Sequence, residues 1–446
     1  MRGPGASPRA PSIDSGAISA ILGEATARLI ELIAEQAQAG NLRLFLVGGV
    51  IRDLLLKRPN HDLDFVLESD AIAFAEALAA EYGGASQAHK AFGTASWRLD
   101  SALAEKLDLP GGALPGHIDF ARARAETYAG PGALPSVMPS GIERDLWRRD
   151  FTLNALALQL SPAQAAGKLL DVSGGLSDLE RKRVRILHDK SFIDDPTRVF
   201  RALRFARRYD FTIERETAAL MKDALPALER VSGIRLSHEI ELILQETTAV
   251  AVMLDLQDLG ALARIHPAFR INSELDERLR MKPDTLPRWT AIPADDPSLN
   301  WSLLLADVGE SDVGAICGRL DLTQALTRAV VASAELVANA SALADAAARP
   351  SEIARLLDGA PEVSLLAAWT ILSQRIKARQ NIDNYVKLWR QLRPVATGND
   401  LKRMGIPPGP RYKVLLDALR SAWIDGDIST QEEEALFLQE LLAKDN

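Results

Sequence analysis

The stretch VGGVIRDLLLKRPNHDLDFVLE, residues 47–68, decides the fold of the first part of the chain. A strand-like run ends at two glycines, a short helical pattern follows, and a second strand-like run carries two aspartates one residue apart. Strand side chains alternate between two faces, so Asp62 and Asp64 share one face while Leu63 points to the other. Two carboxylates so close repel each other, which predicts that they bind a divalent cation.

A third acid lies in another predicted strand, HIDFA at 117–121. If the two strands are neighbours, Asp119 can join the pair in a two-metal site, where ions about 3.5–4 Å apart serve the attacking and leaving oxygens. Magnesium prefers hard oxygen ligands and takes phosphate oxygens as further ligands. The three acids therefore predict phosphoryl transfer.

The glycine pair between strand and helix suits a phosphate. Gly48 and Gly49 carry no side chain, so a phosphate can approach the backbone N–H groups at the start of the helix. Arg52, one turn later, can add charge-assisted bonds to a triphosphate. Alone, a glycine pair is most often a tight turn and an isolated D-x-D a loop or cap feature. The combination of both with a strand and a helix is more specific.

The rest of the chain predicts several domains of an α+β protein. A chain of 446 residues is too long for one ordinary core, and strand patterns fade after about residue 145. We expect a mixed sheet with helices in the head and only helices beyond it. The expected strands are 43–47, 63–67, 95–99 and 117–121, with helices at 17–38 and 70–82. The expected domains are a disordered leader 1–16, a head 17–160, a helical neck 161–265, and a helical body and tail 266–446.

Composition limits the function classes. The net charge is −8, so binding to nucleic acid requires basic residues gathered in one place. The single cysteine, Cys317, rules out an internal disulfide framework and a cysteine-rich zinc site. There is no run of eighteen apolar residues, so no membrane span is expected.

Two further stretches carry candidate binding residues. In RRDFTLNALA, 148–157, the paired arginines can hold a triphosphate, and Asn154 can bond a ribose hydroxyl. The alternative is a capped helix with solvated basic side chains. In DDPTRVFRALRF, 194–205, Arg198, Arg201 and Arg204 recur every three residues beside an apolar stripe. A solvated basic face is the commonest reason for such a row, but an anionic ligand would relieve the repulsion between its charges.

Together these stretches resemble the class II tRNA nucleotidyltransferases (CCA-adding enzymes) and the related bacterial poly(A) polymerases, within the DNA polymerase beta-type nucleotidyltransferase superfamily. VGGVIRD followed by DLDF resembles the family's first motif, and the resemblance covers roughly residues 40–265. It implies a polymerase beta-type head, with Asp62 and Asp64 as ligands of Mg²⁺ and Asp119 helping to activate the attacking hydroxyl.

The resemblance also implies how the nucleotide is bound. Arg149 would bind the nucleotide, with Asn154 near it. Asp195 and Arg198 would read the base edge, which would select C and A against U and G. Arg201 and Arg204 would hold phosphates or order their helix. Asp194 stands where the family usually has Glu, which shortens its reach toward Arg198.

The function that the resemblance implies is addition of C and A to the 3′ end of tRNA from CTP and ATP, with release of pyrophosphate. The body and tail would bind tRNA, in a cytoplasmic protein that is a monomer or a homodimer. Alternatives are an enzyme that adds only A or only C, a poly(A) polymerase, or a non-catalytic RNA-binding protein. The stretch HKAFGTASWRL at 89–99 favours the tRNA group over the poly(A) polymerases.

Overall fold

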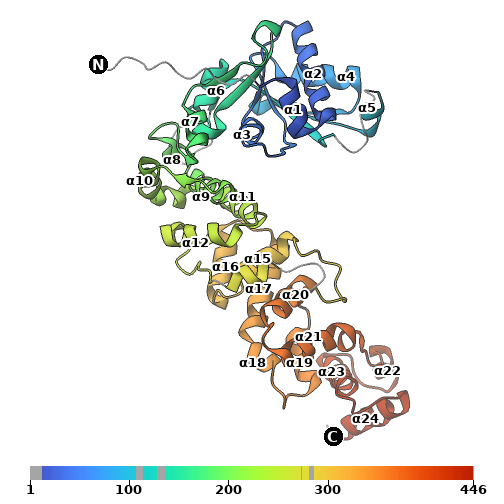
Figure 1. The fold of residues 1–446 in the computed structure, drawn as a ribbon. Coiled ribbons are helices and arrows are strands. Elements are labelled where there is room, and N and C mark those ends of the chain that lie inside the picture. The colour runs from blue at the N-terminus through green and yellow to red at the C-terminus, as the bar shows by residue number, and fades with distance from the viewer. Residues whose placement is uncertain are drawn as a thin grey trace. The chain divides into compact units, whose positions relative to one another are not determined.

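The structure, a computed structural model, divides into two compact units, Met1–Val231 and Ser232–Asn446. Figure 1 shows the elements of both units along the chain. The described residues are 13–106, 114–127, 130, 136–272, 274–280 and 286–444. Most of the expected leader, 1–16, lies outside them, and the first helix begins at Ser15.

A seven-stranded mixed sheet forms the centre of the first unit. Its strand order is β3-β4-β5-β2-β1-β8-β9, with β2 and β5 parallel and every other pair antiparallel. The four strands expected from the sequence are confirmed as β1, β2, β4 and β5, and three more strands join them. The strands are β1 Leu44–Val47, β2 Asp64–Leu67, β3 Ala85–His89, β4 Thr94–Arg98, β5 His117–Arg122, β8 Leu156–Ser161 and β9 Leu169–Asp171.

Apolar side chains cover both faces of this sheet. On one face, Phe65 and Phe120 stack with ring centroids 5.3 Å apart, and Phe74 of α4 (Ala71–Tyr82) meets Phe120 edge-on. On the other face, Val66 belongs to a core that includes Leu146 of α6 (Ile142–Trp147). Burial of each such side chain contributes about 1.5–3 kcal/mol. Because alternate residues of a strand share a face, Asp64, two residues before Val66, lies on the same face of the sheet as α6.

The first helical segment differs from the prediction of one helix over 17–38. It is two helices, α1 (Ser15–Leu22) and α2 (Glu24–Ala39), separated at Gly23. Gly23 has φ of +88°, which no residue inside a helix adopts and which glycine tolerates without strain. The prediction of a single helix was wrong at Gly23, because the apolar spacing on which it rested continues across the break and does not reveal it. Figure 1 shows α2 near α4, and side chains of both helices line one shallow groove.

Short elements complete the first unit. Strands β6 and β7 form an antiparallel hairpin, and β10 pairs with β11 in parallel. The remaining elements are α3 Gly49–Leu55, α5 Ser101–Lys106, β6 Arg124–Thr127, β7 Ser136–Pro139, α7 Gly175–Glu180, β10 Arg183–Val184, α8 Ser191–Asp194, α9 Arg198–Tyr209, β11 Thr212–Ile213 and α10 Arg215–Asp223. The expected neck, 161–265, is not purely helical, because β9, β10 and β11 lie within it.

The described part of the second unit is helical and contains no strand. None of its described helices, or of those in the first unit, is long and apolar enough to cross a membrane. Its helices are α11 Gly233–Leu244, α12 Ala249–Leu259, α13 Ala261–Ile265, α14 Glu274–Leu279, α15 Pro297–Leu305, α16 Glu310–Arg319, α17 Gln324–Ala338, α18 Ala340–Leu343, α19 Pro350–Leu357, α20 Glu362–Ile371, α21 Ile376–Lys387, α22 Gly398–Arg403, α23 Pro410–Asp425 and α24 Gln431–Lys444.

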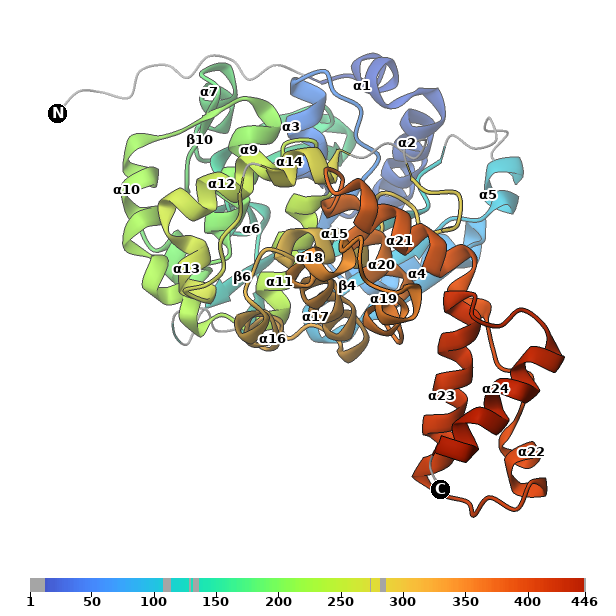
Figure 2. The same ribbon diagram turned by 90° about the horizontal axis from the view of Figure 1, so that it is seen from below.

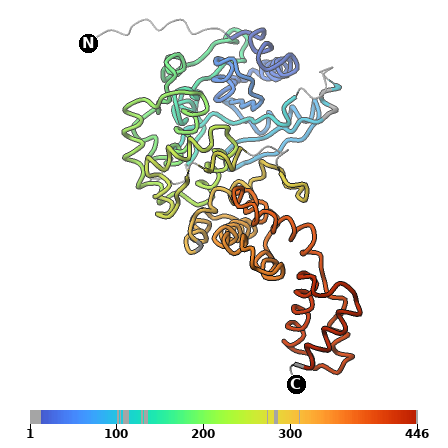
Figure 3. The backbone as a smooth tube through the Cα atoms, turned by 60° about the horizontal axis from the view of Figure 1, so that its bottom comes forward, coloured from blue at the N-terminus to red at the C-terminus, as the bar shows by residue number. Residues whose placement is uncertain are grey.

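The last three helices pack as one group, visible in Figure 2 and at the C-terminal end of the tube in Figure 3. Leu401 of α22, Leu415 and Leu419 of α23, and Leu438 of α24 form their shared core. Residues 404–409 join α22 to α23.

Candidate active site

The strand register brings two of the three predicted catalytic acids together. Asp64 is the first residue of β2, and its partner across the parallel pairing is Asp119 of β5. The Asp119 backbone N–H donates to the Leu63 carbonyl oxygen at 3.1 Å. Leu63 is buried while Asp62 and Asp64 on either side of it are exposed. All three carboxylates therefore lie at one end of these two neighbouring strands.

Desolvation, together with the neighbouring acids, raises the pKa of Asp64. Although Asp64 reaches solvent, desolvation by the surrounding protein raises its pKa to about 6. Arg149 lowers the pKa of Asp64, while Asp119 and Asp62 raise it. A carboxyl group whose pKa is raised by desolvation and by nearby acids is one that a bound cation would favour in its ionised form.

Neighbouring strands orient Asp119. Ser96 of β4 is its cross-strand partner, and the Ser96 hydroxyl donates to Asp119 Oδ1. His117, two residues before Asp119, has its Nε2 3.7 Å from Asp119 Oδ2. One carboxylate oxygen of Asp119 is thus held by the sheet, and the other faces a partly exposed imidazole.

The carboxylates alone would supply only some of the ligands that Mg²⁺ requires, and a bound substrate would supply others. Among the described residues, no group of three or more His, Cys, Asp or Glu side chains is arranged to hold a metal ion. Protein Mg²⁺ sites commonly use one or two carboxylates and complete the octahedron with phosphate oxygens and water. The pair Asp62 and Asp64 suits an ion that arrives with a triphosphate.

An arginine lies over the glycine turn. Gly48 has φ of +75°, and a β-carbon at this position would lie 2.9 Å from Arg149 Nη1 and 3.8 Å from Asp64 Oδ2. A side chain at this position would displace the Arg149 guanidinium from where it lies. The structure thus gathers Gly48, Asp64 and Arg149, which are far apart in the sequence, around one small space.

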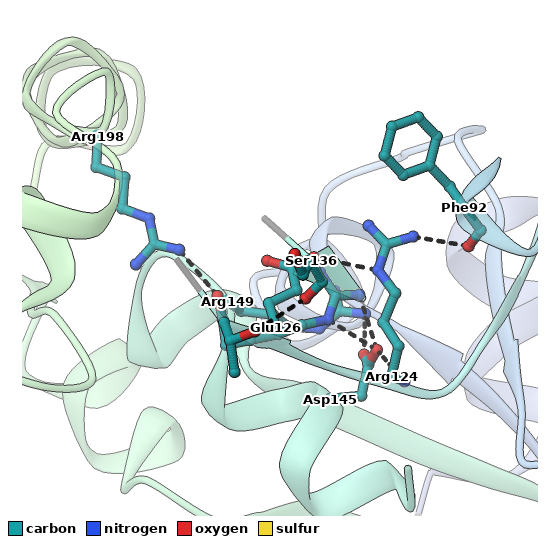
Figure 4. A network of polar contacts seen from close by, with 9 residues as sticks. Phe92, Arg124, Glu126, Ser136, Asp145, Arg149 and Arg198 are labelled. Carbon is teal, nitrogen blue, oxygen red and sulfur yellow. Dashed lines mark hydrogen bonds and ion pairs between the residues drawn. The ribbon is translucent and has the colours of Figure 1, made fainter. Parts of the chain in front are cut away.

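A fully buried carboxylate holds Arg149 (Figure 4). Asp145 Oδ2 accepts from Arg149 Nη2 at 3.1 Å, and Asp145 Oδ1 accepts from Arg148 Nη2 at 2.7 Å. Burial alone would raise the pKa of Asp145, but Arg149 and Arg148 outweigh it and lower that pKa below its ordinary value. Glu126 of β6 accepts from Arg148 at 2.9 Å and from Arg124 at 3.1 Å, which ties the hairpin to α6.

Arg52, which the sequence predicts to contact a triphosphate, is buried among protein side chains. It is 4% exposed and makes two bonds to the Asp53 carboxylate and one, at 2.6 Å, to Asn154 Oδ1. Its guanidinium also lies over the Tyr209 ring, 4.5 Å from the centroid. Gly49 is adjacent, since a β-carbon there would lie 3.4 Å from Arg52 Nη2. These contacts leave Arg52 better suited to orient Asn154 than to reach a phosphate.

Asn154 links this cluster to α9. Its amide nitrogen donates to Asp150 Oδ1 at 2.9 Å, and Asp150 Oδ2 accepts from Arg201 at 2.6 and 2.9 Å. Burial would raise the pKa of Asp150, but Arg201, Asn154 and Arg198 outweigh it and lower the pKa to about 2. Asp150 therefore joins Arg201 of α9 to Asn154.

The remaining predicted residues lie at the start and middle of α9. Asp195 Oδ1 accepts from the backbone N–H and the hydroxyl of Thr197, the residue before α9. Arg198 is buried and donates to the carbonyl oxygen of Arg148 at 2.8 Å. Arg204 is also buried, with its guanidinium over the Phe205 ring at 5.3 Å.

Sequence reasoning missed three polar residues that shape this region: Ser96, Glu126 and Asp145. The signal for Asp145 was present, because it precedes Arg148 by three residues and Arg149 by four, the spacing of ion pairs on a helix. Ser96 and Glu126 carry no such signal, since their partners depend on strand register.

Comparisons with known proteins match this architecture. A family model described as the poly A polymerase head domain matches residues 44–185, and one described as the probable RNA and SrmB-binding site of polymerase A matches residues 210–271. The mixed sheet and its acids thus form the head of a polymerase-type nucleotidyltransferase.

The chain belongs to the tRNA nucleotidyltransferase family. It is 33% identical over 427 residues to the A-adding tRNA nucleotidyltransferase of Halalkalibacterium halodurans, covering 93% of this chain and 92% of that protein. It is 34% identical over 408 residues to the A-adding tRNA nucleotidyltransferase of Geobacter sulfurreducens, covering 88% of this chain but only 44% of that longer protein. The solved structure of the Thermotoga maritima CCA-adding enzyme complexed with tRNA is similar with a TM-score of 0.66 and 28% identity, over 97% of this chain and 98% of that one.

Proposed function

We propose that the chain is a magnesium-dependent enzyme that adds nucleotides to the 3′ end of tRNA. The 3′-hydroxyl of the RNA attacks the α-phosphate of the incoming ATP or CTP, and pyrophosphate leaves. The observation that carries the proposal is the pairing of Asp64 with Asp119 beside Arg149, which lies over Gly48. Two carboxylates that can bind a cation, Asp64 and Asp119, thus lie close to an arginine, Arg149, that can bind a triphosphate.

Each residue has a role in positioning or charge neutralisation, which supply most of the catalysis in phosphoryl transfer. Asp62 and Asp64 would hold Mg²⁺, which, when bound, neutralises negative charge on the triphosphate. Asp119, held through one oxygen by Ser96, assists deprotonation of the attacking hydroxyl. Arg149 binds the triphosphate. The backbone at Gly48 and Gly49 lets it approach.

The nucleotide's sugar and base are held by the segments around Asn154 and Arg198. Asn154 bonds a ribose hydroxyl and is oriented by Arg52, for which this supporting role replaces the direct phosphate contact expected from the sequence. The Asp195 carboxylate accepts from the exocyclic amino group present on both A and C, and Arg198 donates to a ring nitrogen or carbonyl oxygen. Arg201 and Arg204 order the helix on which Arg198 lies.

The helices beyond the sheet bind the RNA in this proposal. The match of residues 210–271 to an RNA-binding family model supports a contact with RNA in that segment. We assign base reading to the neck, 161–265, and tRNA binding to the body and tail, 266–446.

Addition of A is the activity that the relatives favour. A relative that this chain covers almost completely, at 33% identity, is named an A-adding enzyme, whereas a CC-adding relative covered as fully is only 28% identical. Addition of the whole CCA end is the second candidate, because a structure covering 97% of this chain is that of a CCA-adding enzyme bound to tRNA. Both activities use the same acids and the same selection of bases with an amino group.

Three tRNA transcripts decide between these activities. One lacks the whole CCA end, one lacks only the final A, and one is complete. Each is incubated with labelled CTP, labelled ATP or both, with and without Mg²⁺. An A-adding enzyme extends only the second transcript, and a CCA-adding enzyme also completes the first. No metal-dependent incorporation into any transcript would contradict the proposal.

A further inference from the structure

Arg198, to which base reading is assigned above, is held at both ends of its guanidinium. Its Nη1 donates to the Ser191 hydroxyl oxygen at 2.5 Å, and its Nη2 donates to the carbonyl oxygen of Arg148 at 2.8 Å. Figure 4 shows the second contact. Ser191 begins α8 and is fully buried, and Arg198 is 5% exposed.

Two anchors on different nitrogens fix the plane of a guanidinium, whereas one anchor leaves it free to swing. Arginine has five N–H groups in one rigid plane, so the directions of the others follow once Nη1 and Nη2 are held. A hydrogen bond to a base weakens steeply when its donor is misaligned. The orientation of this plane therefore limits how well Arg198 can distinguish one base edge from another.

We propose that Ser191 is a positioning residue that sets nucleotide selectivity through Arg198. Its hydroxyl fixes the guanidinium plane, and the guanidinium then presents its remaining donors to the incoming base. Ser191 itself does not touch the nucleotide. This inference rests on the proposed function and identifies the residue that fixes its selection of A and C over U and G.

The contact of Arg198 with the Arg148 carbonyl oxygen explains why the contact with Ser191 matters. Arg148 is the residue before Arg149, to which triphosphate binding is assigned, and its side chain shares the Asp145 carboxylate with Arg149. The base-reading arginine is thus attached to the segment that holds the triphosphate. Ser191 supplies the constraint that this attachment lacks, because the Arg148 carbonyl alone permits rotation about a single hydrogen bond.

The test measures selectivity, which a merely structural serine would not change. For the full chain and its Ser191→Ala, Ser191→Cys and Ser191→Thr variants, kcat/KM is measured with each of the four nucleoside triphosphates on the tRNA transcript that the wild type extends. Ser333→Ala is the control, because Ser333 is a buried serine in the second unit whose hydroxyl donates to the Ala329 carbonyl at 2.7 Å. Thermal unfolding is recorded for every variant.

We expect the ratio of kcat/KM for the preferred nucleotide over UTP to fall roughly tenfold in Ser191→Ala. Ser191→Cys should fall similarly, because sulfur is a weak acceptor, while Ser191→Thr keeps the hydroxyl and the ratio. Ser333→Ala should keep the wild-type ratio.

Two results would overturn the inference. One is a folded Ser191→Ala protein with an unchanged ratio, and the other is an equal loss for all four nucleotides. If the alanine variant does not fold, the near-isosteric cysteine variant is judged by the same two criteria. A wild-type protein that incorporates no nucleotide would instead refute the proposed function itself.

Discussion

Replacing Gly48 with alanine tests whether Arg149 binds the triphosphate from its place over the glycine turn. Gly48 has φ of 75° and ψ of −135°, a region that only glycine adopts readily. The backbone strain of an alanine there costs about 1–3 kcal/mol of folding free energy. In addition, the new methyl group would lie 2.9 Å from Arg149 Nη1, so the guanidinium must move.

The matched control is Gly83→Ala. Gly83 has φ of 103° and ψ of −171°, and a β-carbon there would meet nothing within 4 Å. Both variants should lose about 1–3 kcal/mol of unfolding free energy in guanidinium titrations. Only Gly48→Ala should weaken use of the nucleotide. Loss of one charge-assisted hydrogen bond costs about 1.5–3 kcal/mol, so kcat/KM for the nucleoside triphosphate should fall at least about tenfold.

A double-mutant cycle isolates the contact between the two residues. With Arg149→Ala already present, Gly48→Ala should reduce kcat/KM by a smaller factor than in the wild type, because the side chain that it displaces is gone and only the approach of the triphosphate to the backbone is still affected. Full additivity of the two effects, or a Gly48→Ala enzyme with the kinetics of Gly83→Ala, would refute the placement of Arg149 at the triphosphate.

Three acid-to-amide variants give further predictions. Asp64→Asn should abolish nucleotide incorporation yet raise the melting temperature of the metal-free protein at pH 7.5. The reason is that it removes a carboxylate whose raised pKa of about 6 reflects desolvation and repulsion. A lower melting temperature would contradict this. Asp145→Asn should raise KM for the nucleotide more than it changes the affinity for tRNA, because it loosens Arg149; equal changes in both would contradict the positioning role. Asp150 has a pKa of about 2 in the folded protein, below its unfolded value, so it stabilises the fold above pH 4 and loses this effect as the pH falls from about 4 to 2. Asp150→Asn should therefore lower the unfolding free energy at pH 7 by about 2 kcal/mol, and a loss that persists at pH 2 would show another cause.

The sequence predicted those parts of the fold that depend on local patterns. Short apolar runs located β1 and β2, alternating apolar residues located β4 and β5, and the closely spaced acids at the start of β2 indicated a cation site. The strand β8 was not predicted. Its Leu156, Leu158 and Leu160 alternate with Ala157, Gln159 and Ser161, but five of its six residues are buried, so no exposed polar face marks the strand. The break between α1 and α2 was missed because one glycine interrupts an otherwise regular apolar spacing.

The site was harder to predict where it depends on contacts between distant segments. The sequence showed Arg52 one turn after the glycine pair, but not that Asp53, Asn154 and the Tyr209 ring surround it. Likewise, the spacing of the arginines in α9 predicts that they form one basic face. In the structure Arg201 pairs with Asp150, and Arg198 bonds Ser191 and a backbone carbonyl. Such partners follow from packing between elements, which local spacing does not encode.

In the proposed mechanism, Asp62 and Asp64 hold a divalent cation against the triphosphate, with Asp119 beside them. The most direct test of this mechanism is a crystal structure of the protein with Mn²⁺ and a non-hydrolysable ATP analogue, with the metal located by its anomalous scattering. We predict a peak about 2.0–2.3 Å from oxygens of Asp62, Asp64 and the phosphates. A nucleotide bound elsewhere, or a metal peak that contacts neither carboxylate, would contradict the account.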